Sequence, residues 1–330
     1  MNTTTNEKTI LGHPRGLFIL FFTEMWERFS YYGMRGLLIV YLTQHFLFSD
    51  ERSAVLYGAY TALVYVMTII GGSLADKYLG SRKAVTFGAI LLVLGHFGMA
   101  FEGNGSRQVL EYGDTTYEVQ LDARGGDARQ LLVSGDTKSY ITFSETEMFI
   151  EDGAAFGLEN VVPREDITLK VVTEEFYLNV LYFSLALIIA GVGFLKANIS
   201  TIVGALYGFG DTRRDSGFTI FYMGINLGAF LSSITCGILG ITYGWKYGFG
   251  LAGIGMAMGL FVFLRYQHWL EGKAEPPSME VLKEKVFLFI DREIMCYLIG
   301  LGIIAVSMFL VMNAELMGGI MLPLGIIMLA

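Results

Sequence analysis

The chain has 330 residues, of which 53% are hydrophobic and 16% charged, and its mean hydropathy is +0.52. Soluble globular domains carry about 25% charged residues, so this composition excludes an ordinary soluble domain and favours a protein of the lipid bilayer. The formal net charge is −8, and we expect no nucleic-acid partner.

Eight apolar runs approach the roughly 20 residues that an α-helix needs to cross a bilayer. The first run is too long for a cleavable signal, so we expect it to be a permanent span. The pattern predicts an all-α polytopic membrane protein with six spans followed by a helical pair. The six spans are expected at 16–42, 54–75, 84–101, 177–206, 217–239 and 247–264, and the pair at 292–312 and 315–330.

The spans divide the chain into four parts. Residues 1–101 hold the first three spans, and residues 176–265 hold the fourth to the sixth. Residues 102–175 form an insertion between the third and the fourth span. Residues 266–330 hold a cytoplasmic linker and the helical pair.

The first span carries ionisable side chains along one face. At 100° per residue, its acids, bases and two neighbouring tyrosines fall within an arc of about 140°. One charge at the middle of a span costs at least about 2.5–3.5 kcal/mol, so we expect this face to line a watery cavity in which the charges pair. The alternative is a buried ion-pair network that only fixes helix packing. The residues are Glu24, Glu27, Arg28, Tyr31, Tyr32 and Arg35.

The insertion differs from the rest of the chain in charge and in periodicity. Residues 101–175 hold 16 acidic and 6 basic side chains, a balance of −10, whereas the other residues hold 15 and 17, a balance of +2. Polar and apolar side chains alternate in 116–121 and 138–143, and Gly-Asp-Thr occurs at 113–115 and 135–137. Alternation and Gly-Asp turns predict a small antiparallel β-domain. The alternative is a disordered acidic loop.

Basic side chains gather in alternate loops of the predicted spans. Positive residues mark the cytoplasmic side, so we expect a cytoplasmic N-terminus, an extracytoplasmic insertion and a location in the cell (inner) membrane. These residues are Lys8, Arg15, Lys77, Arg82, Lys83, Arg213, Arg214, Arg265, Lys273, Lys283 and Lys285.

Four segments carry a family resemblance that covers the chain outside the insertion. The run Glu24-x-x-Glu27-Arg28-Phe29-x-Tyr31-Tyr32-Gly33 resembles the first-helix signature of the proton-dependent oligopeptide transporter (POT) family. Residues 71–83 resemble a loop motif of the wider major facilitator superfamily, residues 191–198 place Lys196 within the fourth span, and residues 221–228 resemble the fifth-helix signature of the POT family.

The resemblance implies a fold, a function and a coupling ion. The fold is the N-terminal six-helix bundle of a major facilitator with two linker helices. The function is proton-coupled symport of di- and tripeptides by alternating access. The resemblance implies no cofactor, only protons as the coupling ion.

The resemblance also assigns roles to individual residues. Lys196 and Arg35 would hold the peptide carboxylate, because lysine offers a point charge and arginine a bidentate fork. The peptide-binding residues are expected to be Arg35, Tyr31, Tyr32, Tyr65, Lys196, Tyr222 and Asn226. The residues expected to couple transport to protons are Glu24, Glu27, Arg28 and Lys196. Asp76 and Arg82 are expected to form a conformational latch.

Two other functions remain open at this point, and an enzyme is not expected. One is a different major facilitator solute carrier, for amino acids or nitrate. The other is a membrane-anchored binding protein that acts through the insertion. An enzyme is not expected because the spans hold no metal-ligand cluster, nucleophile elbow or phosphate loop.

The end of the sequence suggests a further partner. The last apolar run, from Glu315 to Ala330, is short of a full span. Major facilitators combine two six-helix halves around a central site. We therefore expect this chain to hold the N-terminal half and to need a C-terminal helical bundle, besides the bilayer and a peptide, for transport.

Overall fold

The computed structural model describes residues 9–122 and 129–319 and divides into two compact units. The first unit comprises 1–41, 49–102 and 179–330, and it contains nearly all of the helical structure. The second comprises 42–48 and 103–178 and contains the large sheet. The insertion is therefore β-rich, as its alternation predicts.

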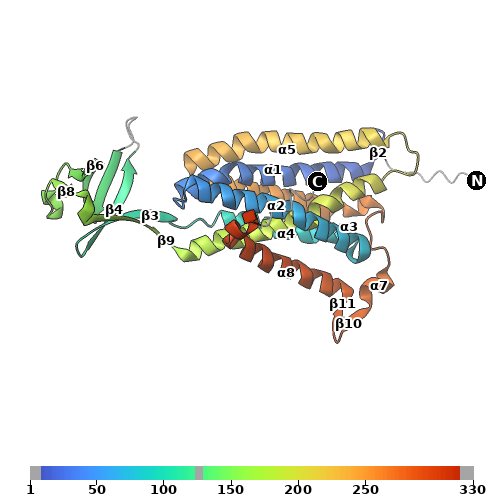
Figure 1. Ribbon diagram of the computed structural model, residues 1–330. Helices are drawn as coiled ribbons and strands as arrows, with labels where there is room; N and C mark the ends of the chain where they lie inside the picture. Colours follow the sequence, from blue (N-terminus) through green and yellow to red (C-terminus); the bar gives the residue numbers. More distant parts are fainter. Residues whose placement is uncertain (1–8, 123–128, 320–330) are drawn as a thin grey trace, which may run out of the picture. The chain divides into compact units, whose positions relative to one another are not determined.

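Helices occupy every predicted span up to residue 312 (Figure 1). Most of the final apolar run, 320–330, lies outside the described residues. Two short helical turns, η1 (Ala75–Leu79) and η4 (Gln267–Leu270), continue α2 and α6. The helices are α1 (Arg15–Gln44), α2 (Asp50–Leu74), α3 (Ser81–Met99), α4 (Glu175–Ala205), α5 (Arg214–Tyr243), α6 (Trp245–Tyr266), α7 (Met279–Lys283) and α8 (Arg292–Met312).

Within the described residues, six helices are long and apolar enough to cross a membrane: α2, α3, α4, α5, α6 and α8. The 30-residue helix α1 is not among them. Its length suffices, and its middle carries the ionisable residues of the first-span signature. Mutual compensation of these charges, rather than hydropathy, must therefore allow α1 to lie among apolar helices.

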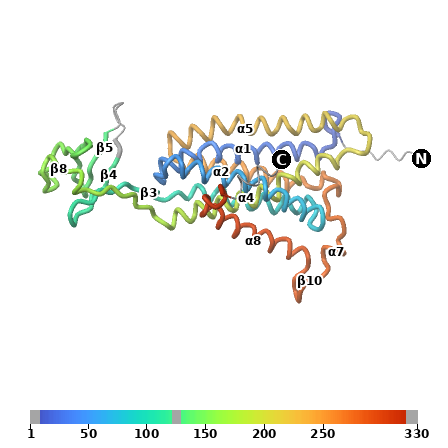
Figure 2. Tube along the Cα trace, viewed as in Figure 1, coloured from blue at the N-terminus to red at the C-terminus, as the bar shows by residue number. Residues whose placement is uncertain are grey.

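The helices approach one another at glycines. Helix α4 meets α2 where Gly193 lies against Met67, so that a Cβ at Gly193 would stand 2.9 Å from the Met67 carbonyl oxygen. Helix α5 runs beside α1, where Gly224 lies against Phe21 (Figure 2). Small residues let membrane helices pack at short range, because a larger side chain would hold the two backbones apart.

The second unit is a seven-stranded antiparallel sheet in the order β8-β7-β6-β5-β4-β3-β9. Strands β3 to β8 follow one another as a meander, and β9 returns to pair with β3. The predicted turns are confirmed: Gly113 and Gly135, with φ of 56° and 61°, begin the two-residue links of β3–β4 and β5–β6. The strands are β3 (Ser106–Tyr112), β4 (Thr115–Asp122), β5 (Arg129–Ser134), β6 (Thr137–Phe143), β7 (Glu147–Ile150), β8 (Val161–Pro163) and β9 (Ile167–Thr173).

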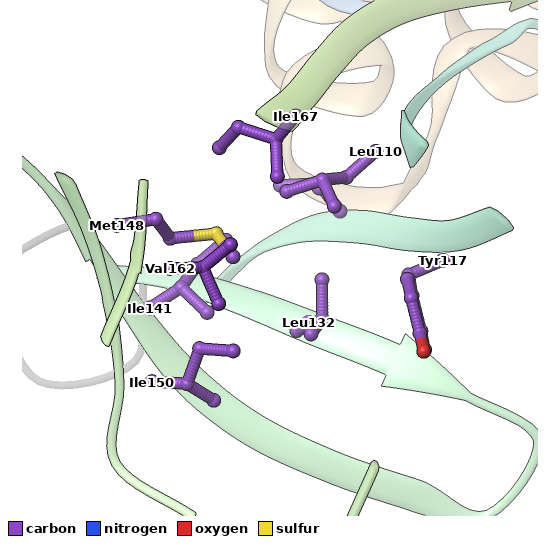
Figure 3. Packing of buried hydrophobic residues seen from close by; sticks show 9 residues of the cluster. Leu110, Tyr117, Leu132, Ile141, Met148, Ile150, Val162 and Ile167 are labelled. Atoms are coloured by element: carbon purple, nitrogen blue, oxygen red, sulfur yellow. The ribbon is translucent and has the colours of Figure 1, made fainter. Parts of the chain in front are cut away.

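One face of this sheet forms a hydrophobic core of its own (Figure 3). Leu110 from β3, Leu132 from β5 and Met148 from β7 are completely buried in it. Short 3-10 turns, η2 (Ala154–Phe156) and η3 (Arg164–Asp166), flank β8. The alternative of a disordered acidic loop is therefore wrong, because side chains of all seven strands share one apolar face.

Two small hairpins complete the described structure. Strands β1 (Thr9–Ile10) and β2 (His13–Pro14) precede α1. Strands β10 (Lys285–Phe287) and β11 (Ile290–Asp291) lie between α7 and α8, in the segment predicted as a linker.

Candidate functional site

The predicted ion pairing on α1 is present, and it is centred on Arg28. The Arg28 guanidinium donates to both carboxylate oxygens of Glu27, one of them at 2.7 Å, and its Nε lies 3.2 Å from a Glu24 oxygen. The exposed fractions of Glu24, Glu27 and Arg28 are 3%, 0% and 3%. A buried cation thus stands between two buried anions.

The expectation that this whole face lines a watery cavity is wrong for these three residues. They are buried, and of the face only Tyr32 and Arg35 are half-buried rather than buried. The reason is that Arg28 pairs with both carboxylates inside the protein, so part of their charge is compensated without water. An ion-pair network that only fixes helix packing would be buried in the same way.

The charges of the cluster do not balance. Two carboxylates face one guanidinium, and the second oxygen of Glu24 has no hydrogen-bond partner among the described residues. A buried carboxylate oxygen without a donor is costly when it is charged. The arrangement is therefore suited to take up a proton or a second cation at Glu24.

Arg35 lies further along α1 and contacts tyrosines instead of acids. Its Nε donates to the Tyr57 hydroxyl at 2.5 Å, and its guanidinium lies 5.3 Å from the Tyr57 ring centroid and 6.0 Å from that of Tyr31. Arg28 lies 5.1 Å from the Tyr31 ring centroid on the other side. Tyr31 therefore links the two cations through cation–π contacts.

Lys196 on α4 is half-buried and lies above Tyr65 of α2, with Nζ 4.8 Å from the ring centroid. Tyr65 itself is 56% exposed. No ion pair of Lys196 is present among the described residues, where its ammonium lies over the Tyr65 ring and acts on Glu24 only through space. A cation held this way remains available to an anionic ligand.

Two predicted peptide contacts on α5 lie apart from these charges. Tyr222 is 52% exposed and packs on Phe218 of its own helix, with the ring centroids 6.1 Å apart. Asn226 is exposed and donates to the Tyr222 carbonyl oxygen at 3.1 Å. The structure presents both side chains on an open helix face and does not bring them into the α1 cluster.

The predicted latch has an acceptor that the sequence does not suggest. Arg82 donates to both Glu275 carboxylate oxygens, at 2.6 and 2.9 Å, and to Gln267 at 3.1 Å. Asp76 is exposed and forms no ion pair with the described residues. Lys83, next to Arg82, bonds Glu293 at 2.5 Å. These bonds tie the start of α3 to the segment that follows α6 and to the start of α8.

Sequence reasoning missed Tyr57, Tyr60 and Glu275. Tyr57 precedes Tyr65 by eight residues, which is close to two helical turns, so the shared face was readable from the spacing. Tyr60 is fully buried, and its hydroxyl has no partner within the described part of the chain. Glu275 lies 193 residues from Arg82, and no local pattern marks such a pair.

A family model described as "POT family" matches residues 82–296. The chain belongs to the POT family. The resemblance to the POT family is thereby confirmed. With six apolar helices in the described residues, the chain is a multi-pass membrane protein of mostly helical fold with a β-rich insertion.

Relatives and solved structures agree with this assignment. The chain is 37% identical over 262 residues to the "Uncharacterized transporter YclF" of Bacillus subtilis (strain 168), covering 78% of this chain and 38% of that protein. It is 33% identical over 286 residues to the "Di-/tripeptide transporter" of Lactococcus lactis subsp. lactis (strain IL1403), covering 84% and 43%. The chain thus spans about two fifths of the length of these relatives.

A crystal structure of a mutant peptide transporter POT in complex with alafosfalin is similar to the chain, with a TM-score of 0.62 and 31% identity. The similarity covers 98% of this chain and 51% of that one. The bundle described above therefore has the fold of one half of a POT-family structure.

Proposed function

We propose that this chain is part of a proton-coupled symporter that carries di- and tripeptides by alternating access. The observation that carries the proposal is the unbalanced buried cluster of α1, in which Arg28 serves two carboxylates and one Glu24 oxygen lacks a donor. Relatives that are described as peptide transporters, and the similar peptide transporter POT structure in complex with alafosfalin, support the substrate class.

The proposed coupling is a charge balance among Glu24, Glu27, Arg28 and Lys196. Two carboxylates and two cations are neutral together. When the peptide carboxylate pairs with Lys196, the acids of α1 lose one compensating cation, and a proton on Glu24 or Glu27 restores the balance. Arg35 carries a charge outside this balance and would hold the other carboxylate oxygen. Peptide and proton thus favour each other's binding, as coupled transport requires. Burial of the acids makes this balance strict, because uncompensated charge is costly in the bilayer.

The remaining parts of the proposal concern the whole carrier. Tyr31, Tyr32, Tyr65, Tyr222 and Asn226 would contact the peptide. Asp76 and Arg82 would act as a latch of the conformational change, and no cofactor would take part. A C-terminal helical bundle would be the partner across the cavity. The N-terminus would be cytoplasmic in the cell (inner) membrane, with the insertion outside.

The test is uptake of a radiolabelled dipeptide, driven by an imposed proton gradient, in vesicles that hold the complete carrier. We expect Glu27→Gln or Lys196→Ala to abolish accumulation at equal amounts of inserted protein. Lys246→Ala is the matched control, because Lys246 also lies over a tyrosine, Tyr247, at 5.1 Å but belongs to no proposed site. Wild-type accumulation by either site variant contradicts the coupling scheme.

A competition assay separates the other solute-carrier functions. Unlabelled tripeptide should displace the dipeptide, whereas a single amino acid or nitrate should not. Displacement by nitrate but not by tripeptide would assign the chain to anion transport.

A further inference from the structure

The two edges of the insertion sheet are built differently. Edge strand β8 has three residues and ends at Pro163, and short strands and proline are ordinary means of blocking an edge. The opposite edge strand, β9, has seven residues and no proline. Its outer side has no further strand among the described residues, as the sheet order shows (Figure 1). One edge is thus blocked and the other open.

Backbone groups of β9 point toward this open side. The Ser106 N–H donates to the His45 carbonyl oxygen at 2.8 Å and not to its cross-strand neighbour Thr173. Hydrogen-bonded and non-hydrogen-bonded pairs alternate along an antiparallel ladder. Ser106 and Thr173 therefore form a non-hydrogen-bonded pair, so the N–H and C=O groups of Thr173 point away from β3. The same holds for every second residue before Thr173, namely Val171 and Leu169. Leu169 and Val171 can therefore form backbone hydrogen bonds with an added strand.

Apolar side chains accompany these backbone groups. Val171 and Val172 are 50% and 43% exposed, and they lie on opposite faces of β9 because successive strand side chains alternate. An added strand would cover both. Lys170, the residue before them, keeps a half-exposed ammonium beside Glu111 at 2.6 Å.

Carboxylates stand at the end of β9. Glu174 follows the strand, is exposed, and accepts a hydrogen bond from Asn104 at 3.1 Å. It borders a pocket of about 260 Å³ that also contains Glu118 and a single guanidinium, that of Arg107. Negative charge is therefore in excess there. The pocket is lined by Asn104, Gly105, Arg107, Glu118, Val172 and Glu174.

We propose that the open edge of β9 binds extended peptides with a free amino terminus by strand addition. An antiparallel peptide begins where β9 ends, so its ammonium meets Glu174 while its backbone pairs with Val171 and Leu169. The inference goes beyond the proposed function and uses none of the residues assigned to transport. It rests on that function only for the supply of peptides to this surface.

A second copy of the chain is a poorer occupant of the same edge. Residues 101–175 carry a balance of −10, so two insertions repel each other, whereas the ammonium of a peptide is attracted. A two-fold pair centred on β9 would also set Lys170 against its own copy, and like charges directly opposite destabilise a sheet.

The test measures binding of a dye-labelled threonine- and valine-rich pentapeptide to the purified full chain by fluorescence anisotropy. A pentapeptide is chosen because it exceeds the proposed di- and tripeptide cargo. Val171→Pro removes an outward N–H without touching the β3 ladder, and Val171→Thr is the matched control that keeps it. We expect Val171→Pro to weaken binding about tenfold and Val171→Thr to leave it unchanged.

Further arms examine charge, folding and other occupants. Glu174→Gln should weaken binding of the free-amine peptide by about threefold and leave binding of its N-acetylated form unchanged. An N-methylated pentapeptide should bind weakly to the wild-type chain, which tests the ladder without any change in the protein. Lys196→Ala should leave pentapeptide binding unchanged, so failure of the transport scheme and failure of this site are separable.

Three results overturn the proposal. They are absence of pentapeptide binding, equal binding by Val171→Pro with normal sheet content, and equal binding of the N-methylated peptide. Self-association of the wild-type chain that Val171→Pro abolishes, measured by sedimentation, would assign the edge to a second copy instead.

Discussion

Replacing Arg28 by methionine tests the buried cluster directly. The substitution keeps an unbranched apolar stem but leaves Glu24 and Glu27, which are 3% and 0% exposed, without their cation. Removing one partner of a buried ion pair typically costs about 3–5 kcal/mol, because the remaining charge is stranded. With two carboxylates stranded, we expect Arg28→Met to reach the upper part of this range.

A compensated variant separates charge from packing. In Arg28→Met/Glu24→Gln/Glu27→Gln no charge remains, and neutral replacement of buried ion pairs is often nearly neutral in stability. We expect it to recover most of the loss. Arg35→Met is the matched control, because Arg35 is half-buried and its hydrogen bond goes to the neutral Tyr57, so its loss should be about 1 kcal/mol.

Thermal unfolding of the detergent-solubilised chain, followed by tryptophan fluorescence at neutral pH, measures these losses. One kcal/mol corresponds to about 2–4 °C for domains of this size, so a loss of about 4–5 kcal/mol in Arg28→Met should lower Tm by about 8–20 °C. The control should lower it by about 2–4 °C. If Arg28→Met matches the control, or if the compensated variant unfolds as early as Arg28→Met, the reasoning from stranded charge is refuted.

Three further outcomes are expected. Hydrogen bonds from Arg82 hold the pKa of Glu275 below its usual value, so Glu275→Gln should lower Tm slightly near pH 7, and this difference should vanish as the pH falls through the lowered pKa of Glu275. Gly113→Ala should destabilise the β3–β4 hairpin by about 1 kcal/mol, because alanine is strained at a φ of 56°. Nothing lies within 4 Å of the new Cβ, so no clash adds to this cost, and faster amide exchange of the hairpin measures it. Replacing residues 103–173 by a short linker should preserve the maximal dipeptide uptake rate of the carrier; its loss at normal expression would mean that the insertion gates transport.

The local order of the chain was predictable. Apolar runs of bilayer length placed the helices, and the predicted helix at 292–312 agrees with α8 at Arg292–Met312. Alternation and Gly-Asp turns predicted the hairpins of the insertion. These features depend on neighbours a few residues away, through helical periodicity, pleating and turn conformation, so a single sequence contains them.

The ion pairing on α1 was predictable from the sequence, but the burial of the paired residues was not. The spacing of Glu24 and Arg28 places them on one face, and the structure pairs them. Whether that face meets water or protein depends on which helices pack against it, and helix packing is not encoded in the periodicity of one helix. The contact between Arg35 of α1 and Tyr57 of α2 was not predicted for the same reason.

Pairings between distant segments were decided only by the tertiary structure. The return of β9 to β3 leaves β9 at an open edge, although the meander before it predicted no such partner. Arg82 forms its ion pair with Glu275 and not with Asp76, which is nearer in the sequence. Composition and periodicity determined that the chain is a helical membrane protein with an acidic β-insertion. Only packing determined which distant groups meet, because a contact between remote residues depends on the path of the whole chain between them.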